Sequence, residues 1–132
     1  MEVTVMIERL LDSVILIDHL DDKNKATRFL SGLDPSKTAI SVITRAEILV
    51  GIDSEDGREK AKALLDQFTP LIIDKAVADK AAELRRAFGW KLPDAFQSAI
   101  ALHHKIKLVT RNTKDFDPIK HDFVEIPYRL SN

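Results

Sequence analysis

The chain has 132 residues, with 45% hydrophobic and 31% charged side chains, and it contains no cysteine. This length and composition suit a single domain spanning 1–132 that buries a core. The absence of cysteine excludes disulfides and cysteine-ligated metal centres and favours an intracellular, cytoplasmic protein. No apolar stretch approaches the ~20 residues of a membrane span. The net charge of −1 argues against a broad nucleic-acid-binding surface, although one or two bound divalent cations would change it to +1 or +3.

The first half of the chain alternates short apolar runs with segments of helical character. An apolar segment near residues 5–11 leads into Asp12. The run at 14–17 is ambiguous from its residues alone, because β-branched side chains favour a strand. The further predictions are a helix over 23–31 ended by Gly32, a strand over 38–42, and helices over 44–52 and 54–68.

The second half continues the alternation and contains clearer helix signals. Asp74 is a good N-cap for a helix whose apolar stripe ends at Gly89, and Pro93 opens another helix to about Lys105. The stripe consists of Val77, Ala81, Leu84 and Phe88. The predicted strands cover 71–73, 106–110 and 123–126. Strands alternating with helices predict an α/β fold, with a parallel sheet covered on both faces.

Acidic residues stand near the junctions at which predicted strands end and helices begin. Glu47 and Asp94 fall in the first turns of predicted helices, and each has a structural reading. Glu47 completes a T-R-A-E capping box with Thr44, and Asp94 complements the helix dipole. Binding sites in parallel α/β sheets form outside the carboxyl ends of the strands, so one end of the sheet could gather these carboxylates. The complete set is Asp12, Glu47, Asp94 and Asp115.

The helix that contains Asp94 presents small and polar residues beside this acid. Gln97, Ser98 and Ala101 follow at i+3, i+4 and i+7, so they share a helix face with the carboxylate. Such neighbours leave room next to Asp94 and indicate a cavity there.

The chain resembles the PIN-domain ribonucleases, especially the VapC-type toxins of toxin–antitoxin modules. The matching stretches are LLDSVILIDHL (10–20), ISVITRAEILVGI (40–52), LPDAFQSAIAL (92–102) and LVTRNTKDF (108–116). Each stretch alone is a weak signal, but four in the family's order and spacing are specific and span nearly the whole chain. The resemblance implies a PIN-like three-layer fold, a five-stranded parallel sheet flanked by helices, and a helix start within 14–17.

The resemblance also implies a Mg²⁺- or Mn²⁺-dependent endoribonuclease with an acidic metal site. Asp12, Asp94 and Asp115 would bind the metal directly or through water, and Glu47 would be a ligand or position the attacking water. Carboxylate oxygens suit these ions, and a bound metal lowers the pKa of water for attack on phosphorus. The supporting polar residues would be Ser13, Thr110 and Asn112.

One position departs from the family pattern. The family usually has a small polar residue, often Asn or Ser, two positions after the first acid, where this chain has Val14. Losing a hydrogen bond that orients a metal-binding carboxylate can weaken metal binding by about 10–100-fold. Either activity is reduced, or Ser13 and Asn112 compensate. A catalytically weakened PIN-like module that binds RNA or protein is therefore an alternative. A phosphoacceptor receiver domain is a lesser one, because Asp12 has no adjacent acid.

The partners that the resemblance implies are an RNA substrate, a small cognate antitoxin and a second copy of the chain in a homodimer. An acidic cluster without metal favours an antitoxin arginine, whose planar fork can bind two carboxylate oxygens. Solvated surface charge and core packing are the competing explanations for the candidate contact residues. The residues considered for RNA or antitoxin contact are Arg85, Arg86, Trp90, Arg111 and Lys114.

Overall fold

A parallel five-stranded sheet forms the centre of the molecule in the computed structural model, which describes residues 6–130. The strands lie in the order β3-β2-β1-β4-β5, and every neighbouring pair is parallel. The α/β fold with a five-stranded parallel sheet is therefore confirmed. The strands are β1 (Arg9–Leu11), β2 (Thr38–Ser41), β3 (Thr69–Leu71), β4 (Lys107–Val109) and β5 (Val124–Glu125). The predicted first apolar segment begins at residue 5, which lies outside the described residues.

Helices separate most of the strands, and their ends agree closely with the local sequence signals. Asp74 caps its helix by accepting a hydrogen bond from Val77 N at 2.9 Å, and Gly89 ends that helix with a left-handed φ of 72°. The ambiguous run at 14–17 is helical. The helices are α1 (Ser13–Leu20), α2 (Asn24–Ser31), η1 (Pro35–Lys37), α3 (Val42–Val50), α4 (Glu55–Leu65), α5 (Lys75–Phe88) and α6 (Leu92–His104).

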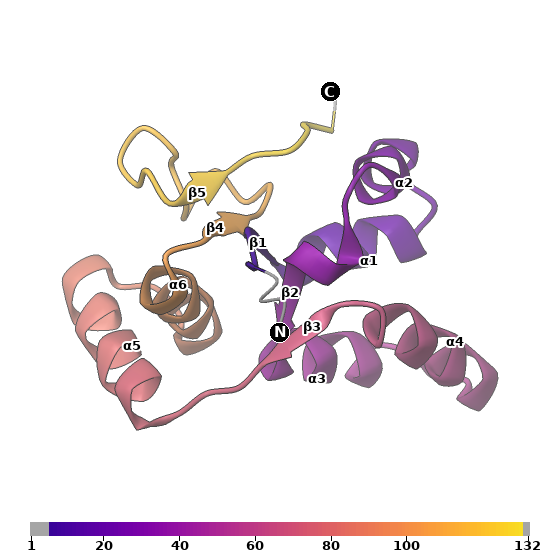
Figure 1. The fold of residues 1–132 in the computed structure, drawn as a ribbon, viewed down its shortest axis with the longest axis horizontal. Coiled ribbons are helices and arrows are strands. Elements are labelled where there is room, and N and C mark those ends of the chain that lie inside the picture. Colours follow the sequence, from indigo (N-terminus) through magenta and orange to yellow (C-terminus); the bar gives the residue numbers. More distant parts are fainter. Residues whose placement is uncertain (1–5, 131–132) are drawn as a thin grey trace, which may run out of the picture.

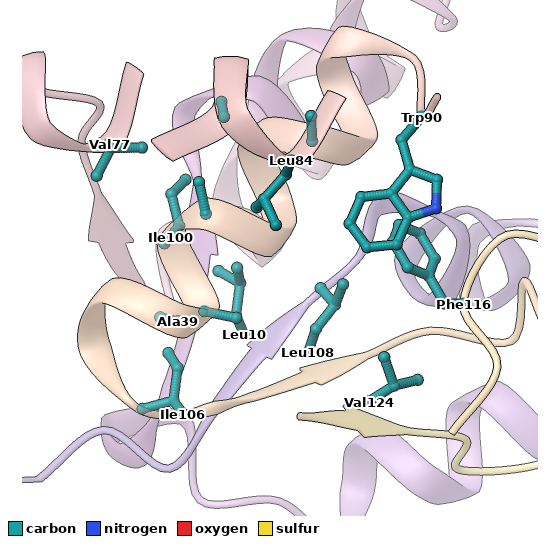
Figure 2. Packing of buried hydrophobic residues seen from close by; sticks show 14 residues of the cluster. Leu10, Ala39, Val77, Leu84, Trp90, Ile100, Ile106, Leu108, Phe116 and Val124 are labelled. Atoms are coloured by element: carbon teal, nitrogen blue, oxygen red, sulfur yellow. The ribbon is translucent and has the colours of Figure 1, made fainter. Parts of the chain in front are cut away.

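The helices cover both faces of the sheet and make three layers (Figure 1). Successive sheet residues point to opposite faces, so Leu10 and Leu11 join different cores. Leu10 and Leu108 face α5 and α6, and this core includes Trp90 (Figure 2). Leu11 faces the opposite core, which is built with residues of α1, α3 and α4. The inner strands β1, β2 and β4 bury residues on both faces, as expected of a parallel sheet, whereas the edge strand β3 has no fully buried residue.

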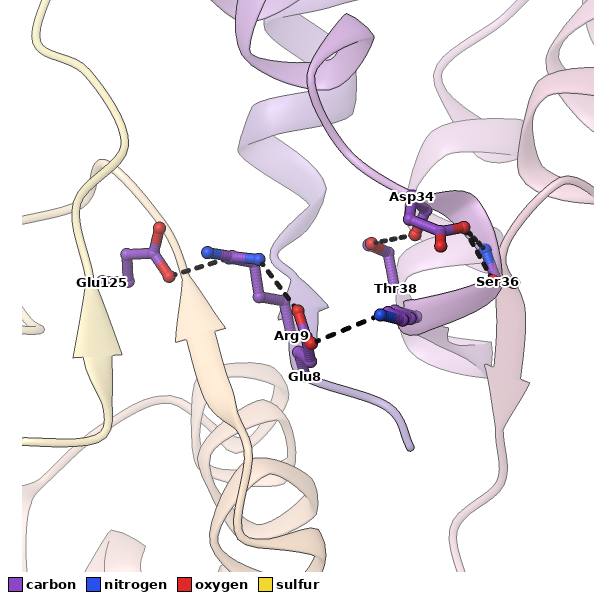
Figure 3. Close-up of polar contacts among 7 residues, drawn as sticks. Glu8, Arg9, Asp34, Ser36, Thr38 and Glu125 are labelled. Carbon is purple, nitrogen blue, oxygen red and sulfur yellow. Dashed lines mark hydrogen bonds and ion pairs between the residues drawn. The ribbon is translucent and has the colours of Figure 1, made fainter. Parts of the chain in front are cut away.

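Polar contacts surround the places where β1 and β2 begin (Figure 3). Arg9 Nε lies 3.0 Å from Glu125 Oε1 of β5, and Arg9 also approaches Glu8 at 3.5 Å. Thr38 Oγ1 donates to the Asp34 carbonyl at 2.9 Å. These contacts link the start of β1 to β5 and the start of β2 to the turn before it.

Two predicted details are wrong. The predicted strand 71–73 lies earlier, at Thr69–Leu71, and pairs in register with β2. Phe88 belongs to the predicted apolar stripe of α5 but is 51% exposed, whereas Val77 and Leu84 are buried. No helix within residues 6–130 is long and apolar enough to cross a membrane.

Candidate active site

Asp12 is the most buried member of the acidic set, with 8% of its surface exposed. It directly follows β1, and its backbone N donates to the Val109 carbonyl of β4 at 2.9 Å. Thr110 Oγ1 donates to Asp12 Oδ2 at 2.7 Å, and Ser13 N donates to Oδ1 at 2.9 Å. Burial raises the pKa of Asp12 although both hydrogen bonds oppose the increase. The carboxylate is thus held in a fixed orientation by groups other than the side chain at position 14.

Asp94 lies in the first turn of α6 and is half-buried. Its pKa is raised from 3.8 to about 6, first by burial and then by the negative charges of Asp12, Asp115 and Glu47, while Lys91 opposes the increase. Like charges raise a carboxyl pKa only when they lie close enough to repel it. The fold therefore brings together the acids that the sequence placed at separate junctions.

Glu47 lies at the exposed rim of this cluster, on α3. Burial and the charge of Asp12 raise its pKa, and a hydrogen bond with the Ser13 side chain lowers it. The predicted capping box is wrong, because α3 begins earlier and Ser41 is its N-cap, accepting from Thr44 N at 3.2 Å. Glu47 is consequently in the second turn of α3. Its carboxylate is not needed for capping.

Asp115 is held by the loop that follows β4. Asn112 Nδ2 donates to Asp115 Oδ2 at 3.0 Å, and Asn112 N donates to Thr110 Oγ1 at 3.1 Å. Trp90 Nε1 donates to the Asp115 carbonyl at 3.0 Å. Thr110 therefore connects the carboxylates of Asp12 and Asp115, through its hydroxyl and through Asn112. Of the two residues expected to compensate for Val14, Ser13 contacts Asp12 whereas Asn112 contacts Asp115.

Buried polar groups on α6 form the floor beside these acids. Gln97 Nε2 donates to Thr44 Oγ1 at 2.7 Å, and the Gln97 side chain also lowers the pKa of Asp12. Gln97 Oε1 and Ser98 Oγ are buried and have no hydrogen-bond partner within residues 6–130. Buried polar atoms normally have a partner. Two such atoms on the helix face of Asp94 leave hydrogen-bonding capacity for water or a hydrated ion.

The donor chemistry of the cluster fits a hard divalent cation, because every ionisable group in it is a carboxylate. Within residues 6–130, no three His, Cys, Asp or Glu side chains converge closely enough to ligate one metal ion directly. Mg²⁺ is usually held by one or two carboxylates and retains several waters. The acidic cluster and its unpaired polar floor fit that kind of water-rich site.

A partly buried ion pair next to the site involves Asp18, which the sequence did not mark as functional. Arg111 Nε and Nη2 donate to Asp18 Oδ2 and Oδ1 at 2.5 and 2.9 Å, and Tyr128 donates to Oδ2 at 2.7 Å. Asp18 is 3% exposed. Arg111, predicted to contact RNA or the antitoxin, is thus already engaged through two nitrogens, and it fixes the loop between Thr110 and Asn112.

The other predicted contact residues differ in their surroundings. Trp90 is 6% exposed and packs in the core (Figure 2), which agrees with the competing explanation of core packing. Arg85 Nη1 donates to the Trp90 carbonyl at 2.7 Å and supports the turn after α5. Arg86 and Lys114 are exposed, and Lys114 lies directly before Asp115.

The sheet order and the acids at its carboxyl edge define a PIN-like α/β protein. The sequence matches the PIN domain family over residues 9–121, and the chain belongs to this family. A comparison with curated proteins found no match.

Solved structures of toxin–antitoxin complexes share the fold. The chain is 35% identical to a chain of a toxin–antitoxin complex from Klebsiella pneumoniae, with a TM-score of 0.85, covering 93% of this chain and 100% of the other. FitAcB from Neisseria gonorrhoeae matches at 23% identity with a TM-score of 0.75, and the match covers 92% of this chain and 99% of the other. DNA-bound VapBC from Salmonella typhimurium matches at 21% identity with a TM-score of 0.77, and the match covers 91% of this chain and 98% of the other. These likenesses are consistent with a VapC-type toxin.

Proposed function

We propose that this protein is a Mg²⁺- or Mn²⁺-dependent endoribonuclease and the toxin of a type II toxin–antitoxin pair, acting in the cytoplasm. The observation that carries the proposal is the gathering of acids around Asp94, whose pKa is raised to about 6 first by burial and then by repulsion from Asp12, Asp115 and Glu47. Such repulsion is relieved when a divalent cation binds. When bound, the cation would supply an activated water and neutralise charge on the phosphate.

The residues of the cluster have separate roles in this proposal. Asp12, Asp94 and Asp115 would hold the cation, directly or through water. Glu47, at the exposed rim, would be a further ligand or would accept a hydrogen bond from the attacking water and orient it. The Thr110 hydroxyl supports this division, because it fixes Asp12 in one orientation and leaves the less buried acids accessible to substrate. Asn112 holds Asp115 in the same way, and the Ser13 side chain lowers the pKa of Glu47.

An antitoxin partner is supported by a hollow next to the acids as well as by the known complexes of the family. The hollow has a volume of about 290 Å³ and lies between α1 and α3, where Ile17, Leu20 and Ile52 form an apolar lining beside Glu47. Ile17 and Leu20 are 39% and 40% exposed. An antitoxin segment would cover these side chains and place a basic residue among the carboxylates. In this proposal residues 1–132 form a single domain, and two copies of the chain form a homodimer.

A nuclease assay on purified, antitoxin-free protein tests the proposal. We expect cleavage of RNA with Mg²⁺ or Mn²⁺, no cleavage with EDTA, and recovery when the metal is restored. Asp94→Asn keeps the shape of the side chain and should lower the rate by on the order of 100-fold. Asp53→Asn is the matched control, because Asp53 is exposed and outside the cluster. Cleavage that persists in EDTA, or equal losses in both variants, would contradict the metal mechanism.

The same assay decides the alternative, a PIN-like module that binds RNA or protein without cutting. Val14 keeps this alternative open, because it replaces the usual polar residue with an apolar one that packs into the core formed by α1, α3 and α4. RNA binding without cleavage under any metal condition would favour it. The phosphoacceptor receiver alternative is wrong, because the chain belongs to the PIN domain family and has the sheet order 3-2-1-4-5.

A further inference from the structure

A second hollow shares Asp115 with the proposed metal site and extends from it to Phe88 at the end of α5. Its volume is about 470 Å³, and its lining includes Phe88, Trp90, Lys114, Lys120 and His121. Small-molecule sites in proteins are typically about 300–1,000 Å³. The hollow is therefore large enough for a ligand group that continues outward from the acids.

An aromatic group forms one wall of this hollow. Phe88 stacks on Trp90, with ring centroids 4.7 Å apart and planes inclined by 25°. His121 meets the Phe88 ring edge-on at 4.9 Å and contacts Trp90 at 5.1 Å. Trp90 is buried beneath the group, but Phe88 remains 51% exposed. A large aromatic side chain that is rigidly supported and half exposed is suited to stacking on a planar ligand.

The exposure of Phe88 results from the end of α5. The apolar spacing of this helix would bury Phe88 with Leu84, but Gly89 turns the chain through a left-handed conformation. Trp90 then enters the core position beside Phe116, with ring centroids 5.1 Å apart. Arg85 holds the turn by donating to the Trp90 carbonyl. The half-exposed ring is consequently fixed by local backbone geometry and by the packing of Trp90.

Two lysines supply positive charge to the same hollow. Lys114 and Lys120 are exposed, and neither forms an ion pair with any of residues 6–130. Two acids, Asp115 and Asp117, also line the hollow, and each already accepts a local hydrogen bond. Asp115 Oδ2 accepts from Asn112 Nδ2, and Asp117 Oδ1 accepts from Ile119 N at 2.9 Å. The lysine ammonium groups therefore remain available for an anionic ligand.

We propose that this hollow binds a nucleotide of single-stranded RNA next to the scissile phosphate, with its base stacked on Phe88 and its phosphate near Lys114 and Lys120. The inference rests on the proposed function, because only an RNA-cutting site makes a flanking nucleotide the natural occupant. Aromatic rings alternating with cations are the usual chemistry for unpaired RNA, since every base has a π-face. The site would bind with little base preference.

The single tryptophan of the chain makes the inference directly measurable. Trp90 lies beneath the proposed stacking surface, so titration with a short single-stranded oligoribonucleotide in EDTA should change its fluorescence without cleavage. Phe88→Ala should raise the dissociation constant for RNA by about 10-fold, because stacking on one aromatic ring changes affinity by roughly 5- to 150-fold. Phe88→Tyr keeps the ring and should retain the affinity. With metal, Phe88→Ala should raise KM more than it lowers kcat.

Charge variants and the catalytic variant separate this site from the proposed function. Lys114→Ala and Lys120→Ala should each weaken RNA binding, whereas Lys60→Ala, on α4 and paired with Asp56, should leave it unchanged. Asp94→Asn should bind RNA no more weakly than the wild type while cutting it on the order of 100-fold more slowly. Equal RNA affinity and KM for Phe88→Ala and wild type would overturn the subsite without affecting the nuclease proposal. Loss of antitoxin binding with unchanged RNA binding would also overturn it, because the surface would then be a protein contact.

Discussion

Arg111 and Asp18 form a bidentate, partly buried ion pair although 93 positions separate them in the chain. Arg111 lies between Thr110, which binds Asp12, and Asn112, which binds Asp115. Asp18 is on α1, the helix that begins directly after Asp12. The pair therefore fixes the loop after β4 against the helix after β1, and both of these segments carry acids of the candidate active site.

We expect Asp18→Asn to destabilise the protein by about 1.5–3 kcal/mol at pH 7, because it removes the charged partner of Arg111. Burial alone would raise the pKa of Asp18, but hydrogen bonds from Arg111 and Tyr128 hold it below its ordinary value of 3.8. The stabilisation is therefore present above that value and is lost as pH falls through the lower pKa of the folded state. Urea unfolding at several pH values should show the two proteins converging in acid.

An exposed ion pair provides the control for this prediction. Arg45 and Asp66 lie 2.8 Å apart, and the side chain of Asp66 is 66% exposed. Asp66→Asn should lower the free energy of unfolding by less than about 1 kcal/mol. If both substitutions lowered the free energy of unfolding equally, the Asp18–Arg111 pair would stabilise the protein no more than an exposed ion pair does.

The opposite pH dependence is expected of Asp94 in the metal-free protein. Its pKa is higher in the folded state, at about 6 against an ordinary 3.8, so the folded form binds the proton more tightly. The free energy of unfolding therefore falls as pH rises through this interval, and the whole loss of stability is present at neutral pH. In EDTA at pH 7.5, Asp94→Asn should raise the free energy of unfolding by on the order of 1 kcal/mol. A decrease in Tm would contradict the assigned repulsion.

Thr110→Val tests how strongly the active-site geometry depends on one hydroxyl. Valine keeps the shape of the side chain but removes the donor to Asp12 and the acceptor for Asn112 N. We expect the Mg²⁺ concentration for half-maximal RNA cleavage to rise by about 10-fold or more. Thr113→Val, at an exposed position of the same loop, is the control. An unchanged metal requirement would mean that other groups orient Asp12 sufficiently.

Toxicity in cells tests the partner and the acidic cluster together. Expression of the wild type alone should slow growth, and co-expression of a small neighbouring antitoxin should relieve the effect. Asp12→Ala should be harmless without any antitoxin, because it removes the central carboxylate. Full toxicity of Asp12→Ala, at equal protein levels, would show that harm does not arise from the acids.

The sequence by itself determined the elements and the edge at which the acids lie. Short apolar runs, the Asp74 cap, the Gly89 stop and the Pro93 helix start are local signals, because backbone geometry and hydrogen bonding act within a few residues. Parallel strands end at a common edge, so acids at their junctions were expected near one another. The resemblance to a known family supplied the strand count and the helix at 14–17.

The tertiary structure alone decided which side chains meet. The sequence left ligand contact open for both Arg111 and Trp90. In the structure Arg111 binds Asp18, and Trp90 lies in the core while Phe88 is exposed. The sequence allowed Glu47 a capping role beside its proposed place in the metal site, whereas the structure has Ser41 as the N-cap of α3. Such outcomes depend on packing between segments remote in sequence. A local pattern cannot specify them, because the energy of a buried charge or ring is set by whichever partners the complete fold places beside it.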